Sequence, residues 1–263
     1  MNNTKKHILI HDSNNNAIKG INKYIISNVN EDYSIIFSKF HGKLLSTIQK
    51  YKPAIAMLSS SEYTQEFHDF ISEYHTQIKI FLIIDSPINN EQLNNFLDNT
   101  NVQIIKNTIS SHNYKKTIAE YNNLYDDKLF YDHKLERNNK IVALLSLDNQ
   151  KNSVLEKITY PNKKYRIVAL NNPNFKSPIN LGLCNYSDLS YIFNTYDKVI
   201  DIDQRFRLEA QASNIPYLSF DLTEESIVNN IENNITVPCV ENIETYTYDF
   251  FVKQTLLPHL RNA

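Results

Sequence analysis

The sequence predicts an α/β protein of two domains, each a mostly parallel sheet with helices wound on both faces. Short apolar runs alternate with longer amphipathic stretches, which is typical of strands buried on both faces and joined by helices. The alternation is interrupted once, by a polar and aperiodic stretch at 125–140, and then resumes. A length of 263 residues accommodates two such domains.

The first series begins with the run HILIH, which predicts a strand, and the stretch after it has the helical spacing of apolar residues. Four more strand–helix pairs follow before the interruption. The predicted strands are 7–11, 34–40, 54–58, 78–84 and 102–106, and the predicted helices are 17–29, 42–51, 62–74, 90–99 and 111–125. Alternation at this spacing favours βαβ units and a doubly wound sheet.

The second series repeats the pattern without any visible internal sequence repeat. Its predicted strands are 140–147, 165–170, 181–184, 198–202 and 215–220, and its predicted helices are 151–160, 186–196, 205–214 and 223–234. A loop is predicted at 171–180, and the tail 241–260 has the pattern of a final amphipathic helix. The domains are therefore expected at 1–125 and 140–243, with a linker at 126–139 and a C-terminal helix at 244–263.

Composition and charge exclude several classes of protein. The net charge of −2 argues against a dedicated nucleic-acid binder. The three glycines, Gly20, Gly42 and Gly182, stand too far apart for a P-loop or a dinucleotide-binding fingerprint. Two cysteines give neither a disulfide framework nor a zinc site, so a reducing compartment is expected. No signal peptide and no apolar stretch of membrane-spanning length is visible, which predicts a cytoplasmic protein without an integral membrane segment.

Polar residues follow most of the predicted strands. In open α/β sheets, ligands bind at the carboxyl ends of the strands. The polar residues at these ends are at 11–13, 41–42, 59–61, 85–86, 148–151, 171–172, 201–205 and 221. His11 and His41 are candidates for proton transfer, because histidine titrates near neutral pH. The alternative is that these residues only cap helices and form turns.

The stretch DIDQRFRLEAQASNIPY at 201–217 carries the most specific pattern in the chain. Asp201 stands eight positions before Glu209, which opens the run Glu-Ala-Gln-Ala-Ser-Asn-Ile-Pro. The pattern fits a strand that ends at an acid, a helix that carries a second acid, and a left-handed cap. Asn214 suits that cap, because asparagine is second only to glycine there. The stretch resembles the donor-binding segment of retaining glycosyltransferases of the GT-B fold. Their hallmark is Glu, seven residues, Glu, and then Ala-x-Ala-Ser-Gly-x-Pro.

Two upstream segments resemble the same family. LSLDNQKN at 145–152 is similar to the family's Gly-Arg-Leu-x-x-x-Lys-Gly turn, with Leu147 and Lys151 at matching positions. The segment 180–193 resembles the strand and turn that carry a lone glycine, here Gly182. The chain departs from the family beside the first acid, where Ile202 and Gln204 stand in place of glycines.

The resemblance implies two facing Rossmann-like domains, with the acceptor bound by 1–125, the donor by 140–243, and the C-terminal helix returning to the first domain. It implies transfer of a sugar from a nucleotide-diphosphate sugar, without a cofactor, to an acceptor that is a glycan, a lipid-linked sugar, a protein or a nucleic acid. The expected catalytic residues are Asp201, His11 and Asp85, and the expected donor-binding residues are Lys151, Asn172, Gly182, Arg205 and Glu209.

Other interpretations stay open. Asp201 and Asp203 form an Asp-x-Asp pair, which holds a divalent metal in the unrelated GT-A fold. Because the surrounding pattern is that of GT-B proteins, we expect metal-independent transfer and no metal site. The missing glycines favour a second interpretation, a catalytically degenerate GT-B-like module that binds a glycan or a protein. A third is an α/β structural protein without enzymatic activity.

Overall fold

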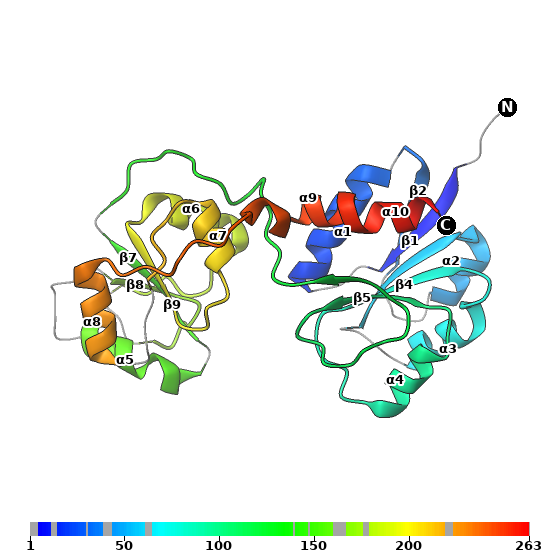
Figure 1. Ribbon diagram of the computed structural model, residues 1–263, viewed down its shortest axis with the longest axis horizontal. Helices are drawn as coiled ribbons and strands as arrows, with labels where there is room; N and C mark the ends of the chain where they lie inside the picture. Colours follow the sequence, from blue (N-terminus) through cyan, green and yellow to red (C-terminus); the bar gives the residue numbers. More distant parts are fainter. Residues whose placement is uncertain are drawn as a thin grey trace. The chain divides into compact units, whose positions relative to one another are not determined.

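The computed structural model of the chain describes residues 5–11, 15–29, 31–38, 44–60, 65–138, 140–146, 148–159, 167–175, 179–218 and 223–262. The chain divides into two compact units (Figure 1). Unit 1 comprises Met1–Leu124 and Thr245–Ala263, and unit 2 comprises Tyr125–Glu244. Each unit contains its own parallel sheet with helices packed against it, so the predicted α/β class is confirmed.

Unit 1 contains a six-stranded sheet in which every neighbouring pair of strands is parallel. Its strands are β1 (Lys6–His11), β2 (Tyr33–Ser38), β3 (Ile55–Ser59), β4 (Lys79–Ile84), β5 (Gln103–Asn107) and β6 (Thr117–Tyr121). They lie in the order β2-β1-β3-β4-β5-β6. The order reverses between β1 and β3, the place where doubly wound sheets open a crevice at their carboxyl edge.

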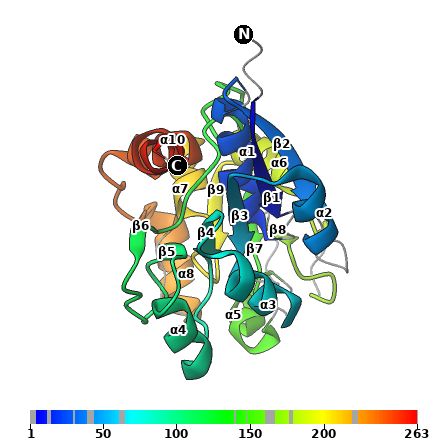
Figure 2. The same ribbon diagram turned by 90° about the vertical axis from the view of Figure 1, so that its right-hand side faces the viewer.

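Helices cover both faces of this sheet because successive strand residues point to opposite sides. Ile8 and Ile10 pack under α1 (Asn16–Val29) and the C-terminal segment, whereas Leu9 packs under the helices on the other face. Those helices are α2 (Leu44–Tyr51), α3 (Gln65–Tyr74) and α4 (Glu91–Asp98). All four helices follow strands as predicted. Figure 2 shows α10 (Leu257–Arg261) of the C-terminal segment and α2 on opposite sides of the strands.

The C-terminal segment forms a succession of short helical turns, although one continuous helix was expected. The turns are η2 (Ile243–Tyr246), α9 (Tyr248–Phe251), the π-helical turn η3 (Val252–Leu256) and α10 (Leu257–Arg261). Its apolar residues join the core that α1 covers, and α9 and η3 lie against α1. The end of α10 is anchored to the sheet, because the Tyr33 hydroxyl donates to the carbonyl of Leu260 at 3.2 Å and the Lys79 amine donates to that of His259 at 3.0 Å.

The prediction of a helix at 111–125 is wrong, because this stretch contains strand β6. Ala119 and Tyr121 are buried while Glu120 between them is exposed, which is the period of a strand. The buried pair packs into the core that the C-terminal segment covers, and the rings of Tyr121 and Phe251 lie 5.6 Å apart. The C-terminal segment thus occupies the face that a helix after β5 would cover, and the chain from β5 to β6 crosses over without one.

We predict that replacing Gly20 with alanine destabilises unit 1. An added Cβ on this helix α1 residue would lie 2.6 Å from two ring carbons of Tyr248, which is buried. Alanine favours a helix by about 1 kcal/mol over glycine, but overpacking costs about 1–3 kcal/mol. We therefore expect a net loss of stability in urea titrations. The loss should shrink when Tyr248→Leu is added, and additive effects of the two substitutions would contradict the contact.

Unit 2 contains a three-stranded parallel sheet in the order β8-β7-β9. Its strands are β7 (Ile141–Leu144), β8 (Ile167–Leu170) and β9 (Lys198–Asp201), and its helices are α5 (Asn149–Thr159), α6 (Tyr186–Thr195), α7 (Arg207–Ala212) and α8 (Glu224–Asn233). The strand predicted at 181–184 is not formed, since only Asn180 bridges to Ala169 beside β8. The strand predicted at 215–220 is reduced, within its described part, to single bridges at Tyr217 and Leu218.

The segment expected to link the domains packs on unit 2 over most of its length. The ring of Phe130 is buried against Phe193 of α6, and the Ser190 hydroxyl donates to the carbonyl of Leu129. The guanidinium of Arg137 donates four hydrogen bonds to backbone carbonyls at the ends of two helices, those of Phe193, Tyr196, Ser213 and Asn214. This segment therefore fixes the ends of α6 and α7 relative to each other.

Candidate functional site

The candidate site lies at the carboxyl edge of the unit 2 sheet, where β7, β8 and β9 end. Asn152 and Asn172 tie the first two of these strand ends together through the backbone of Ser146. The Asn152 amide donates to the Ser146 carbonyl at 2.7 Å and accepts from the Ser146 N–H at 3.0 Å. The Asn172 amide donates to the same carbonyl at 3.1 Å. Asn172, expected to bind the donor, is 3% exposed and thus braces the strand ends.

Three charged side chains meet at the end of β9. The carboxylate of Asp203 pairs through one oxygen with the Lys151 amine at 3.2 Å and through the other with the Arg205 guanidinium at 3.1 Å. The two cations come from different elements, Lys151 from α5 and Arg205 from the turn before α7. The structure therefore brings together two of the residues that were expected to contact the donor diphosphate. About half of each cationic side chain is exposed.

Asp201 is the last residue of β9 and is 2% exposed. Its carboxylate accepts hydrogen bonds from the backbone N–H of Phe206 at 2.8 Å and from the Tyr217 hydroxyl at 3.1 Å. Burial raises the pKa of Asp201, and these two hydrogen bonds oppose the rise. Asp201 thus holds the turn that leads into α7, a role that a short carboxylate at a strand end fills well.

Glu209 lies on α7 and is buried, with 5% of its surface exposed. Burial raises the pKa of Glu209 to about 8, and the charge of Asp201 adds to the rise. The backbone N–H of Glu209 itself opposes this rise of the pKa, and no other described residue donates a hydrogen bond to the carboxyl group. A buried carboxyl with this much unused hydrogen-bonding capacity is costly, unless it is protonated or a ligand supplies donors.

Three tyrosines lie near Glu209, and one of them, Tyr217, also contacts Asp201. Burial raises the pKa of Tyr125 to about 12 and also raises the pKa values of Tyr186 and Tyr217, and the negative charge of Glu209 adds to the rise in all three. These phenols are therefore neutral donors at physiological pH. None of the three was among the expected site residues. Tyr217 is the last residue of the pattern at 201–217, and that position is the sequence signal that points to it.

The backbone of 201–217 has the conformation expected from the sequence pattern. Asn214 has a φ of 55° in the left-handed cap after α7, so this prediction is confirmed. Gln204, which stands where the family has a glycine, also has a left-handed φ of 53°. Such a backbone strains a residue other than glycine by roughly 1–2 kcal/mol.

Gly182 has a φ of 67°, and an added Cβ would meet no other atom within 4 Å. Its role is thus conformational: the loop after β8 turns here, and its carbonyl accepts a hydrogen bond from the Asn171 N–H at 2.7 Å. Gly182 lies in the same unit as Lys151 and Glu209, but no contact with either of them is described.

The other two predicted catalytic residues lie in unit 1. His11 ends β1, is 1% exposed, and its ring packs edge-on against Phe67. Asp85 follows β4 and is half-buried; its carboxylate accepts hydrogen bonds from the Asn15 amide at 2.5 Å and from the Tyr121 hydroxyl at 2.8 Å. Asp85 thereby connects the end of β4 with the start of α1 and the end of β6. Several residues of the sequence analysis lie outside the described residues, namely His41, Gly42, Leu147, Asp221 and positions 12, 13 and 61.

No protein-family model matches this chain, and no curated protein matches it significantly. The family resemblance therefore stays a prediction that rests on the sequence patterns at 145–152, 180–193 and 201–217. In the described part of the chain, no group of three or more histidine, cysteine or acidic residues is arranged to hold a metal ion. Within that part, none of the helices has the length and apolarity needed to cross a membrane.

Proposed function

We propose that this protein is a glycosyltransferase, in which unit 2 binds a nucleotide-diphosphate sugar and the sugar passes to an acceptor bound by unit 1. One observation carries the proposal: Glu209 is buried, and within the described chain no other residue donates a hydrogen bond to its carboxyl group. The two hydroxyl groups of a ribose can donate the hydrogen bonds that the Glu209 carboxyl group does not receive from the protein. A carboxylate can accept a hydrogen bond from both hydroxyls.

The cations at the end of β9 fit the diphosphate of such a donor. In this proposal, Lys151 and Arg205 turn from Asp203 to the phosphates, since about half of each side chain is exposed and free to reorient. They stabilise the charge that develops on the leaving diphosphate, which is commonly the largest contribution to catalysis. Positive charge from side chains takes the place of a divalent metal, and Asp201 lies beside the sugar.

On the acceptor side, we propose Asp85 as the carboxylate that receives the acceptor hydroxyl. It is half-buried and already accepts two hydrogen bonds from neutral donors, which keep it oriented. His11 is much more deeply buried, so in this proposal it shapes the strand end and does not transfer a proton.

The direct test is calorimetric titration of the full chain with uridine, adenosine and guanosine diphosphate sugars, in buffer that contains EDTA. We predict that Asp203→Asn strengthens the binding of the preferred donor by about three- to tenfold, because it releases Lys151 and Arg205 and removes a charge that repels the diphosphate. Lys151→Met should weaken binding. Donor binding that requires added manganese, or that is lost in Asp203→Asn, would show instead that the Asp-x-Asp pair holds a metal.

A second candidate is a degenerate module that binds a glycan or a protein. The ion pairs of Asp203 favour it, since both cations expected to contact the diphosphate are already neutralised. The same titrations separate the two candidates. If neither the wild type nor Asp203→Asn binds any nucleotide sugar, the glycosyltransferase proposal is wrong and a search with glycan arrays follows.

A further inference from the structure

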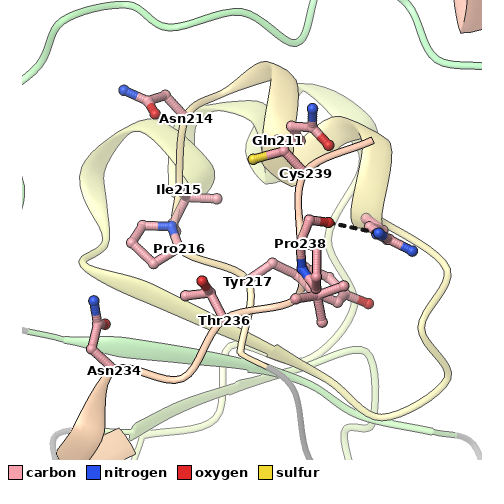
Figure 3. A pocket seen from close by; sticks show the side chains of 11 residues that line it. Gln211, Asn214, Ile215, Pro216, Tyr217, Asn234, Thr236, Pro238 and Cys239 are labelled. Carbon is pink, nitrogen blue, oxygen red and sulfur yellow. Dashed lines mark hydrogen bonds between the residues drawn. The ribbon is translucent and has the colours of Figure 1, made fainter. Parts of the chain in front are cut away.

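Unit 2 contains a pocket of about 250 Å³ that the proposed function does not use (Figure 3). It lies between the end of α7 with the loop that follows it and the segment 234–239 after α8. Its volume is slightly below the range typical of small-molecule sites, so it suits a compact ligand.

The walls of the pocket combine apolar and polar side chains. Ile215 and Pro216 form one side, and Pro238 lies across from them (Figure 3). Tyr217 and Val237 also line the pocket. The two sides are held in place, because the side-chain amide of Gln211 both donates to and accepts from the backbone of Val240, at 2.8 and 2.7 Å. A pocket whose walls are already fixed loses little entropy when a ligand binds.

Arg207 is the one charged residue among the described residues that line the pocket. Its Nη2 donates to the carbonyl of Pro238 at 2.6 Å, and its Nε is buried without a hydrogen-bond partner in the described part of the chain. No ion pair joins Arg207 to a described carboxylate. The pocket therefore has a positive charge beside the apolar residues of its lining, and the exposed side chains of Asn234 and Thr236 add polar groups at its rim.

We propose that this pocket binds a small organic carboxylate with a compact apolar body. The carboxylate pairs with Arg207, because arginine presents planar donors that match a carboxylate and a partly desolvated charge favours an anion. The apolar body packs between Pro216 and Pro238. A bare inorganic anion uses the charge but leaves the apolar walls in contact with water, so the organic anion is the better fit.

The pocket is separate from the proposed donor site, although Tyr217 belongs to both. The Tyr217 hydroxyl donates to Asp201, whereas the residue also lines the pocket. Glu209, Lys151 and Arg205 do not line the pocket. Binding of a carboxylate here is therefore expected to be unchanged by Glu209→Gln, which separates this proposal from the proposed function.

The test uses Cys239, an exposed thiol that lines the pocket. The full chain is alkylated with iodoacetamide in the presence of benzoate, benzamide or inorganic phosphate, and peptide mass spectrometry gives separate rates for Cys239 and for Cys184, which does not line the pocket. Benzoate at about four times its dissociation constant should slow the alkylation of Cys239 about fivefold and leave Cys184 unchanged. Benzamide, which has the same shape without the charge, should not protect.

Two variants test whether benzoate binds in this pocket through Arg207. Arg207→Met should raise the dissociation constant of benzoate by about ten- to a hundredfold, whereas Arg205→Met should leave it unchanged. Because Arg207 also holds the carbonyl of Pro238, Thr236→Phe serves as a second variant that fills the pocket from its exposed rim and should abolish protection. Absence of protection by benzoate, equal protection by benzamide, or protection by phosphate alone would each overturn the proposal.

Discussion

Glu209→Gln is expected to weaken the binding of a nucleotide sugar by about 10- to 100-fold while unit 2 stays folded. The variant replaces a buried carboxyl by a neutral amide of the same shape, so the packing of α7 on the sheet is kept. A hydrogen bond to a charged group contributes about 1.5–3 kcal/mol, which corresponds to this loss of affinity. Calorimetry and circular dichroism on the same sample measure both quantities.

The binding should also depend on pH through the same residue. With its pKa near 8, Glu209 is mostly protonated in the free protein at pH 7, and a ligand that donates to the carboxylate must displace that proton. Affinity should therefore rise about tenfold per pH unit up to about pH 8 and level off above it. Glu209→Gln should lose this dependence.

Stability should change with pH in the opposite direction. The folded pKa of Glu209 lies above the ordinary value of 4.5, so between these two values the folded state binds more protons than the unfolded state. The free energy of unfolding therefore falls as the pH rises through this range, and this contribution disappears in Glu209→Gln. Glu241→Gln, at an exposed turn of the same unit, is the matched control. If Glu209→Gln lowers the melting temperature but binds the donor as tightly as the wild type, Glu209 has a structural role. The proposed function would then lose the observation on which it rests.

Arg137→Met is expected to lower the free energy of unfolding of unit 2 by about 2–4 kcal/mol. Its guanidinium donates to the carbonyls of Phe193 and Tyr196 at the end of α6 and to those of Ser213 and Asn214 after α7. Removing a cation from two helix ends loses charge-assisted hydrogen bonds and a favourable interaction with both helix dipoles. Water replaces part of these bonds, since Arg137 is only half-buried.

Hydrogen exchange resolved by peptide measures this loss in unit 2 separately from unit 1. We expect faster exchange at the ends of α6 and α7 and unchanged exchange in β1 to β5. Arg137→Lys should be intermediate, because a single amine cannot reach all four carbonyls. Arg261→Met, at the exposed end of α10, is the control and should have an effect within about 0.5 kcal/mol. Equal exchange in Arg137→Met and wild type would show that Arg137 does not hold the ends of α6 and α7.

Much of the candidate site was predictable because its residues follow one another along the chain. The acid at the end of β9, the second acid on α7 and the left-handed Asn214 all lie within 201–217 and depend on local backbone geometry. The ion pairs of Asp203 were not predictable, because Lys151 lies 52 positions away and comes from another helix. The buried state of Glu209 also depends on its surroundings, which no local pattern encodes.

The sequence alone determined the α/β class, the two parallel sheets and most helices, since apolar period and strand length depend on nearby residues. Tertiary structure decided which of the predicted strands and helices actually form. The stretch 117–121 was expected to be helical, but it pairs with β5, and the C-terminal segment, more than a hundred positions later, covers the face that a helix would need. In unit 2, the stretches 181–184 and 215–218 have strand-like composition but lack continuous partners, and a β-strand exists only where a neighbour satisfies its backbone hydrogen bonds.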